Sequence, residues 1–370
     1  MIYLDYQATT PVAPEVAAAM RPWIEEKFAN PHSPSRWGRE AAAAIEVARD
    51  QVEQALGLAG GRFAFTSGAT EAINWAIKGM FEDSQRKKLV TVATEHAAVL
   101  DTAEWLEAKG IEVVRLRVGA DGLIDLDLAE ALIDDKTAMV AVMLVNNEIG
   151  VIQPIAELTQ MAHRVGALML CDAVQGFGRL PVPDGPDLIA ISGHKIHGPK
   201  GIGGLWMRAG VEPEPLLHGG GQEQGLRSGT LAPALCVGMG ESARLAAERR
   251  EADFVHIEKL SEIALSTFGQ GWIINGSLDQ RYRGNLNLRR DMLDGARLIS
   301  DMRNIAFSLG SACASGSGRP SHVLRAIGLT DRQARSSIRL GFGRYTGEEE
   351  LASACRRINE AAHEQTVLPA

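Results

Sequence analysis

The sequence lacks the features that mark a disulfide framework, a zinc finger or a membrane span. Its four cysteines lie far apart without a C-x-x-C pair, so we expect each to be a buried hydrophobe or a reactive thiol. The longest uninterrupted apolar run that we find, residues 138–145, is too short to cross a bilayer. The first residues show no basic stretch followed by an apolar one. We therefore expect a cytoplasmic protein without a membrane partner.

A block of basic residues is also missing. The 38 basic residues are outnumbered by 46 acidic ones, and the net charge of -8 argues against a nucleic-acid partner. No strand-linked G-x-G-x-x-G and no G-x-x-x-x-G-K-[ST] is present, which leaves little support for nucleotide binding. His194 and His197 have H-x-x-H spacing, but Gly198 and Pro199 interrupt the helix that would aim both at one metal. We expect no metal site.

What the chain does have is an alternation of strand and helix patterns over most of its length. Its 370 residues, 45% of them apolar, suffice for one large domain and a smaller one. Apolar patterns predict strands at 63–66, 89–93, 111–118, 139–145, 168–171 and 187–191, with helices at 15–27, 40–56, 99–109 and 126–133 among them. This order predicts an α/β fold with a mostly parallel sheet between layers of helices.

A long helix is expected at 234–265, interrupted or bent by Gly238 and Gly240, and it marks the predicted domain boundary. The remainder has strands near 272–275 and 284–288 and helices near 295–302, 321–327 and 348–361, which indicates a smaller α+β domain. We assign residues 13–245 to the large domain. Residues 1–12 and 246–370 form the small one.

Polar clusters follow four of the predicted strands. They are residues 94–96, 146–148, 172–175 and 192–195. In an open parallel sheet, ligands gather at the carboxyl ends of the strands. Any one cluster alone would be an ordinary loop, but four such coincidences predict a site.

The last cluster holds one of only two lysines between residues 137 and 258, Lys195 and Lys200. Lys195 directly follows a strand and has Ser192 and His194 beside it, which could hold an anion. Such an amine suits an aldehyde cofactor that carries a phosphate, namely pyridoxal phosphate (PLP), bound as a Schiff base. The alternative from this stretch alone is a Gly-rich turn with solvated lysines.

The other clusters fit the same cofactor. Asp172 ends an apolar strand, where a carboxylate needs a cation such as a protonated pyridine nitrogen, and Gln175 could donate to the ring's phenolic oxygen. His96 suits a ring stacked on the pyridine that also carries protons, although a lone histidine is more often structural. The turn Gly68-Ala69-Thr70 before a helix offers free N–H groups to a phosphate, or is an ordinary helix cap.

At this point the chain resembles a known family, the cysteine desulfurases of the PLP-dependent class V aminotransferase-like superfamily. The resemblance covers nearly the full length and implies a PLP-transferase fold of type I. It rests on nine stretches that match in order: YLDYQATTPVAP, FTSGATEAIN, TEHAAVLD, VNNEIGVIQP, CDAVQGFGRLP, SGHKIHGPKGIGG, HGGGQEQGLRSGTL, GSACAS and SSIRLGFGRYTGEEE.

The resemblance implies a role for each candidate residue. Lys195 is similar to the Schiff-base lysine, Asp172 to the pyridinium partner, Gln175 to the phenolate partner and His96 to the stacking acid–base residue. The phosphate ligands are expected to be Gly68, Ala69, Thr70, Ser192 and His194, with Thr230 reaching the phosphate of a neighbouring subunit in a homodimer. Asn147 and Arg339 resemble the residues that hold the substrate carboxylate, for which a planar guanidinium is apt.

Cys313 resembles the nucleophile that takes sulfur from L-cysteine as a persulfide and leaves L-alanine. Its setting, LGSACASGSGRP, is rich in Gly and Ser, which predicts a movable loop rather than a buried position. The resemblance also implies a sulfur-acceptor protein and a role in iron–sulfur cluster or other thio-cofactor biosynthesis. Gln222 and Gln224 stand where many relatives carry His and Arg, and the chain stops soon after its last helix, which puts the acceptor in doubt.

Three alternatives stay open on the sequence. A selenocysteine lyase or a class V aminotransferase would share the cofactor residues and would not require Cys313. A non-catalytic scaffold protein could keep the fold, although Lys195, Asp172 and Cys313 are all present.

Overall fold

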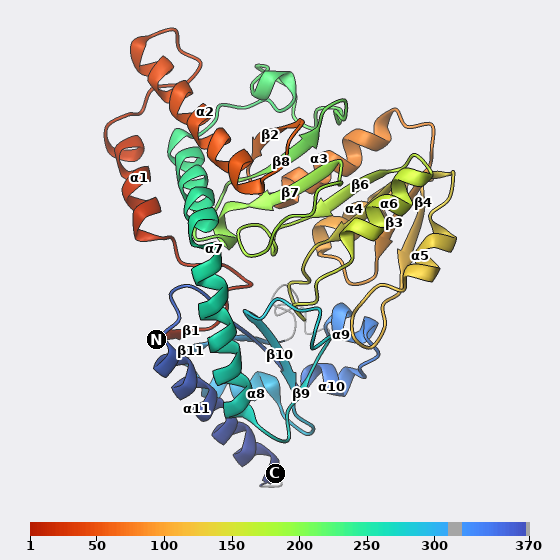
Figure 1. The fold of residues 1–370 in the computed structure, drawn as a ribbon, viewed down its shortest axis with the longest axis vertical. Coiled ribbons are helices and arrows are strands. Elements are labelled where there is room, and N and C mark those ends of the chain that lie inside the picture. The colour runs from red at the N-terminus through yellow and green to blue at the C-terminus, as the bar shows by residue number, and fades with distance from the viewer. Residues whose placement is uncertain (310–319, 368–370) are drawn as a thin grey trace.

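The computed structural model describes residues 1–309 and 320–367, the side chains of the last two of these excepted. Figure 1 shows a large unit built on one sheet, a smaller unit below it, and one long helix that runs down the side of both. No helix within the described ranges combines the length and the apolar character that a membrane span requires.

The large unit is built around a seven-stranded sheet with the order β2-β8-β7-β6-β5-β3-β4. Its strands are β2 (Gly61–Thr66), β3 (Lys88–Val92), β4 (Glu112–Leu116), β5 (Thr137–Met143), β6 (Leu168–Asp172), β7 (Leu188–Ser192) and β8 (Gly203–Arg208). Neighbours from β7 to β4 pair in parallel, and β8 pairs antiparallel with both β2 and β7. The predicted, mostly parallel sheet is confirmed.

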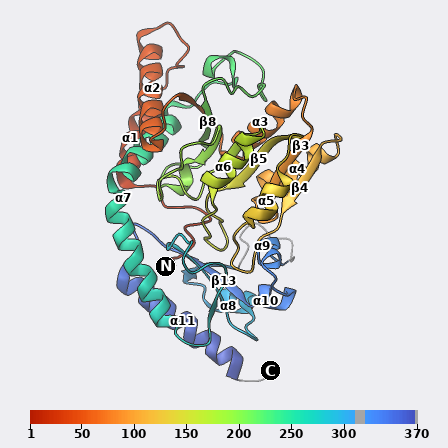
Figure 2. The same ribbon diagram turned by 45° about the vertical axis from the view of Figure 1, so that its right-hand side comes forward.

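Helices cover both faces of this sheet (Figures 1 and 2). The helices α3 (Ala69–Glu82) and α4 (Ala97–Glu107) pack on one face, in a core that contains Trp75 and Leu106. The other face carries α2 (Arg36–Leu56), α5 (Leu126–Leu132), α6 (Ile155–Arg164) and the start of α7 (Pro233–Phe268). The helix α1 (Pro14–Glu25) lies farther out, against α7.

The helix α7 continues without a break through the two glycines that were expected to interrupt or bend it. A side chain at Gly238 would meet Met20 Sδ at 2.6 Å, and one at Gly240 would meet Ala48 Cα at 2.6 Å. Both glycines therefore let α1 and α2 approach α7 closely. The predicted interruption is wrong, because these glycines serve close packing between helices.

The smaller unit has a four-stranded antiparallel sheet and a two-stranded parallel one. The first has the order β12-β13-β10-β9 and the second pairs β1 with β11. These strands are β1 (Ile2–Tyr3), β9 (Ile273–Ile274), β10 (Asn285–Arg289), β11 (Ile305–Ala306), β12 (Ser308–Leu309) and β13 (Ser337–Gly341). Its helices are α8 (Gly295–Asp301), α9 (His322–Ala326), α10 (Asp331–Arg335) and α11 (Glu348–Val367). The second half of α7 and α11 close its core.

The first residues of the chain connect the two units. Ile2 and Tyr3 pair with β11, and Asp5 bridges to Gly341 at the end of β13. The chain then crosses to the loop after β7, where Thr10 N donates to His194 O. We call residues 4–13 the crossing segment.

Candidate active site

One large cavity lies at the carboxyl ends of the parallel strands. Its volume is about 620 Å³. All four polar clusters contribute to it, through His96, Asn147, Asp172 and Lys195 among others. The crossing segment and Arg339 of β13 form further parts of its wall. The prediction that strand ends would gather these side chains into one place is therefore confirmed by the geometry.

Lys195 sits on one turn of 3₁₀ helix, residues Gly193–Lys195, directly after β7. Its Nζ donates to Gln7 O at 2.5 Å and to Ala8 O at 2.8 Å, both in the crossing segment. The tight loop depends on glycine, because a side chain at Gly198 would meet Gly193 O at 2.8 Å. The large unit therefore directs Lys195 into the cavity, and the crossing segment, which comes from the small unit, holds its amine.

Two carboxyl groups lie buried at the carboxyl ends of β6 and β3, the strands on either side of β5. Asp172 Oδ1 accepts from Val174 N at 2.9 Å, and Glu95 Oε1 accepts from Met143 N at 2.7 Å. Burial raises the pKa of Asp172, an effect that His96 and Lys195 oppose. Burial, and then Asp172, raise the pKa of Glu95 well above its ordinary value. A cationic group in the cavity would stabilise the Asp172 carboxylate, which is what a pyridinium nitrogen supplies.

His96 begins α4 as its N-cap residue. Its Nδ1 accepts from Ala98 N at 3.1 Å, so the neutral ring carries its proton on Nε2. The ring lines the cavity together with Asp172 and Asn147. Helix capping therefore fixes the tautomer, with the proton on the nitrogen that a proton transfer would use.

An anion cradle forms one end of the cavity. Gly68, Ala69 and Thr70 lie at the N-terminus of α3, and Ser192 and His194 line the same cavity from the loop after β7. Burial, and then Lys195, lower the pKa of His194 to about 4. At neutral pH this imidazole is therefore a neutral donor or acceptor, and helix N–H groups supply the positive potential that a phosphate needs.

Gln175 is held in a defined orientation. Its Nε2 donates to Gln7 O at 2.9 Å and its Oε1 accepts from Arg179 Nη1 at 2.5 Å. Arg179 Nη2 also donates to Lys195 O at 2.9 Å. Because an amide nitrogen carries two protons, the second Nε2 proton of Gln175 can serve a ligand in the cavity.

Arg339 and Asn147 come together as predicted. Arg339 Nη1 donates to Asn147 O at 2.9 Å, and Arg339 Nη2 donates to Asp5 Oδ1 at 2.7 Å. The Arg339 side chain is only 1% exposed, yet it forms part of the cavity wall. A buried guanidinium at this wall suits a ligand carboxylate.

Two predicted residues lie outside this group. Thr230 is exposed on the loop before α7 and does not line the cavity of its own chain. Cys313 lies outside the described residues. The chain reaches Cys313 from Ser308, whose Oγ donates to Asp5 Oδ2 at 2.8 Å, and leaves it near Ser321, whose Oγ donates to Glu148 Oε2.

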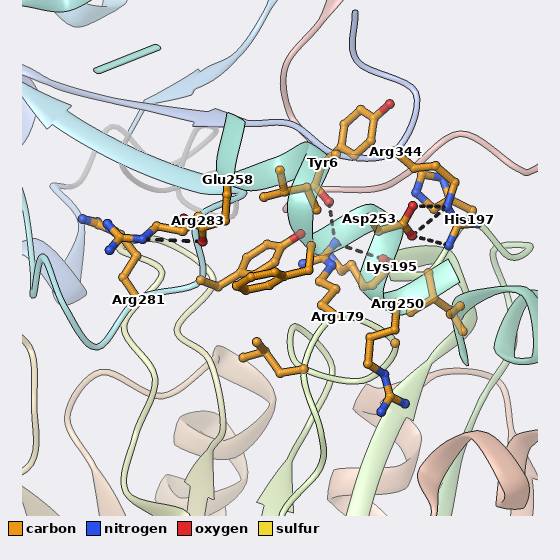
Figure 3. A pocket seen from close by; sticks show the side chains of 18 residues that line it. Tyr6, Arg179, Lys195, His197, Arg250, Asp253, Glu258, Arg281, Arg283 and Arg344 are labelled. Atoms are coloured by element: carbon orange, nitrogen blue, oxygen red, sulfur yellow. Dashed lines mark hydrogen bonds and ion pairs between the residues drawn. The ribbon is translucent and has the colours of Figure 1, made fainter. Parts of the chain in front are cut away.

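A second, smaller cavity lies on the other side of the Lys195 loop, between α7 and residues 281–283, which precede β10. Figure 3 shows it, with a volume of about 50 Å³. Arg344 pairs with Asp253 at 2.6 Å beside His197, and Arg283 lies 3.8 Å from Glu258. These ion pairs join α7 to loops of the small unit behind the lysine.

Sequence reasoning missed four residues that shape the site: Asp5, Glu95, Glu148 and Arg179. Glu95 and Glu148 sit inside clusters that had been identified, so a buried carboxyl at a strand end was the available signal. Asp5 and Arg179 act through contacts with residues far away in the sequence. No local pattern carries that information.

The residues present fit PLP. The cavity joins an amine, a buried carboxylate and an anion cradle, with Lys195, Asp172 and Thr70 all on its wall. Lys195 would hold the aldehyde, Asp172 the ring nitrogen and the α3 N-terminus the phosphate. Fold and site together define an enzyme of the PLP-dependent transferase class.

The comparisons with known proteins agree with this class. The family model described as aminotransferase class-V matches residues 2–353, and the chain belongs to that family. A protein named cysteine desulfurase IscS from Rickettsia bellii is 44% identical over 97% of this chain and 91% of its own length. A solved structure titled NIFS-like protein has a TM-score of 0.91 at 34% identity, over 98% of this chain and 99% of its own. Another, titled SspA in complex with cysteine, has a TM-score of 0.82 at 35% identity, over 94% and 100%.

Proposed function

We propose that this protein is a PLP-dependent cysteine desulfurase. It converts L-cysteine to L-alanine and transfers the sulfur to a cysteine of its own as a persulfide. The observation that carries the proposal is the single cavity that joins Lys195, Asp172 and His96 to Arg339. The relatives named cysteine desulfurase, at 44% identity over nearly the whole chain, support the same activity.

The overall reaction balances without an outside oxidant. The C–S bond of the substrate breaks, an S–S bond forms at the enzyme thiol, and the substrate carbon takes a proton to become the methyl group of alanine. Carbon is reduced while sulfur is oxidised. Bound PLP supplies an electron sink for the substrate's α-carbon.

The protein's own residues bind and orient the substrate and transfer protons. Arg339 and Asn147 bind the carboxylate and so fix the substrate's orientation. His96 carries a proton at Nε2, since its Nδ1 is engaged by Ala98 N. With PLP bound, the Asp172 carboxylate would stabilise a positive ring nitrogen and Gln175 would offer an N–H to the phenolic oxygen. Lys195 provides the amine that holds the cofactor and exchanges protons near the α-carbon.

Cys313 is the proposed sulfur acceptor. The described residues on either side of it, Ser308 and Ser321, contact Asp5 and Glu148, which lie beside Arg339 and Asn147. The chain thus lies close to Arg339 and Asn147, the proposed carboxylate-binding residues, both at Ser308, before Cys313, and at Ser321, after it. This placement supports Cys313 as the thiol that meets the substrate's sulfur.

We propose the domain division at residues 13–245 against 1–12 and 246–370. Two hydrophobic cores that meet within α7 support a division in this helix: the first reaches Ile257 and the second includes α7 from Leu260 onward. A homodimer, with Thr230 on the partner's phosphate, and a protein sulfur acceptor for iron–sulfur cluster or other thio-cofactor biosynthesis complete the proposal. A cytoplasmic location stays a prediction of the sequence.

Cys313→Ser tests the function. The serine variant should retain PLP and still change the cofactor's absorbance when cysteine is added, because the binding residues are intact. It should form neither alanine nor persulfide, since a hydroxyl is far less acidic and nucleophilic than a thiol. Alanine is measured by chromatography, and peptide mass analysis of the wild type should place the extra sulfur on the Cys313 peptide.

Cys355→Ala is the matched control, because Cys355 is buried in the small unit's core and away from the cavity. It should keep desulfurase turnover. Alanine release by Cys313→Ser at the wild-type rate would instead favour a selenocysteine lyase or an aminotransferase on this fold.

A further inference from the structure

Asp5 contacts Arg339, and neither the sequence analysis nor the proposed reaction gives Asp5 a role. We propose that Asp5 sets the strength of the carboxylate clamp: it holds the Arg339 guanidinium in place and offsets its charge, so that substrate and product carboxylates bind reversibly. This inference rests on the proposed function, in which Arg339 binds the carboxylate of an amino acid.

Arg339 is positioned from several sides. Its backbone lies in the middle of the small sheet, opposite Asn287 on β10 and Ser308 on β12. Its Nη1 donates to Asn147 O at 2.9 Å, and its Nη2 donates to Asp5 Oδ1 at 2.7 Å. Within residues 1–309 and 320–367, Asp5 is the carboxylate that forms an ion pair with Arg339.

Asp5 is itself held rigidly. Its Oδ2 accepts from Ser308 Oγ at 2.8 Å, and its backbone carbonyl accepts from Ala8 N at 2.9 Å and from Tyr3 Oη at 3.2 Å. Its backbone also bridges to Gly341, two residues after Arg339. A side chain fixed at both oxygens keeps the guanidinium in one orientation at little further entropic cost.

The placement separates support from binding. Arg339 forms part of the cavity wall and Asp5 does not, so Asp5 contacts the guanidinium from outside the cavity. A guanidinium has five N–H donors, and Arg339 Nε has no hydrogen-bond partner among the described residues. The clamp can therefore bind a ligand carboxylate while Asp5 stays bound.

The charge has a second consequence. Arg339 is 1% exposed and Asp5 is 17% exposed, so water screens their interaction weakly. A carboxylate that enters the cavity meets a guanidinium whose charge Asp5 already balances, and it is repelled by Asp5 itself. The enzyme must release an amino acid carboxylate after every turnover, and a clamp of moderate strength serves that need.

The charge and the positioning can be separated by substitution. Asp5→Asn keeps an oxygen that accepts from Arg339 Nη2 and an amide that can donate to Ser308, but it removes the negative charge. Asp5→Ala removes both the charge and the support. Asp253→Asn is the matched control, because Asp253 is 19% exposed and pairs at 2.6 Å with the buried Arg344 outside the large cavity.

The holoenzymes are titrated with L-alanine, and binding is followed by the cofactor's absorbance and by calorimetry. We expect Asp5→Asn to bind L-alanine roughly tenfold more tightly than the wild type, since a like charge near the carboxylate is gone. Asp5→Ala should bind it more weakly than Asp5→Asn does, and Asp253→Asn should match the wild type. Cysteamine, which has no carboxylate, should bind the wild type and Asp5→Asn equally.

Unchanged or weaker L-alanine binding by Asp5→Asn overturns the proposal. If that variant does not fold, a crystal structure of the wild type with L-alanine decides: Asp5 should still contact Arg339 beside the bound carboxylate, and an Asp5 displaced by the ligand contradicts the inference. The two proposals fail separately. If the wild type converts cysteine to alanine and Asp5→Asn binds L-alanine no more tightly, only the clamp is refuted. If Asp5→Asn binds L-alanine tenfold more tightly but the wild type forms no alanine from cysteine, only the desulfurase is refuted.

Discussion

At the scale of single residues, burial controls the charges around the cavity. Burial lowers the pKa of His194 to about 4 and that of His197, on the same loop, to about 3, so both rings are neutral at physiological pH. Glu148 lies beside the carboxylate clamp, and burial raises its pKa to about 7, opposed by Ser321, Arg339 and His96. These states depend on what the side chains contact, and their neighbours in the sequence do not reveal them.

Glu148→Gln should change how stability depends on pH. The pKa of Glu148 is raised from 4.5 in the unfolded chain to about 7 in the folded protein, so the folded state holds a proton that the unfolded state releases. Wild-type stability should therefore fall as pH rises from about 4.5 to 7, by at most about 3 kcal/mol. Glutamine stays neutral and should remove this contribution, so that the melting temperature of the variant rises relative to the wild type over that window.

Glu130→Gln is the control for this measurement, because Glu130 is 63% exposed and does not line the cavity. Its melting temperature should follow the wild-type curve at every pH. Parallel curves for Glu148→Gln and the wild type would show that Glu148 does not hold the proton.

At the scale of elements, local patterns predicted the regular parts of the fold and missed those that depend on distant packing. The helix expected at 40–56 ends as predicted at Gly57, whose φ of 70° suits glycine. It begins earlier, at Arg36, because Ser35 accepts from Gly38 N at 3.1 Å and caps it. The helix α6 and the strand β13 were not predicted from the sequence.

The strand β8 shows why such elements escape prediction. It begins with Gly203 and Gly204, and glycine is depleted in strands. In the folded protein the ring of Phe63 packs over Gly204, and the backbone of Gly68 packs over Gly203. The glycines are needed for contacts with β2 and the turn after it, which no pattern within β8 records. The cavity residues were predicted because each directly follows a strand that the local sequence reveals. Their partners in the crossing segment were not predicted, because they lie far away in the sequence.

Gly203→Ala should weaken cofactor binding without touching the cofactor. A methyl group there would meet Ile191 O at 2.6 Å and Gly68 C at 2.8 Å, so the backbone of the anion cradle must shift. We expect the PLP dissociation constant to rise by at least about tenfold, because displaced N–H groups lose their hydrogen bonds to a charged phosphate. Dialysis followed by absorbance measures this. Gly347→Ala, where a methyl group would meet no atom closer than 3.7 Å, should bind PLP as the wild type does.

At the scale of the whole molecule, one exposed residue carries the argument for a dimer. Thr230 lies on the turn-rich loop before α7 and does not reach its own cavity. Arg227 anchors this loop to α3 through an ion pair with Glu71 at 2.7 Å. Thr230 is therefore held near the end of the molecule where the cradle lies, and faces outward.

Mixed dimers test whether Thr230 acts across the interface. Thr230→Ala alone should weaken PLP binding by roughly ten- to a hundredfold, as expected for one hydrogen bond to a charged group. Lys195→Ala should lose the cofactor's bond and all turnover, whereas Lys200→Ala should keep the yellow colour. A heterodimer of Thr230→Ala and Lys195→Ala has one complete site only if Thr230 serves the partner, and it should then show about half of the wild-type activity per dimer.

The comparison dimer carries both substitutions in one chain and pairs it with a wild-type chain. There the intact Lys195 would face a partner without Thr230, so its PLP affinity should resemble that of Thr230→Ala. Equal activity of the two mixed dimers would contradict a role across the interface.

The crossing segment also has a consequence for biosynthesis. Residues 2–10 are synthesised about 300 residues before their partners, which include Ile305, Ala306, Ser308, Arg339 and Gly341. The carbonyls of Gln7 and Ala8 that hold Lys195 are therefore not in place until residues 339–341 have been made. Contacts between such distant parts of a sequence form late in folding. A chain that stops before residue 339 can build the large sheet and still lack a finished lysine site, so cofactor retention reports that synthesis has passed β13.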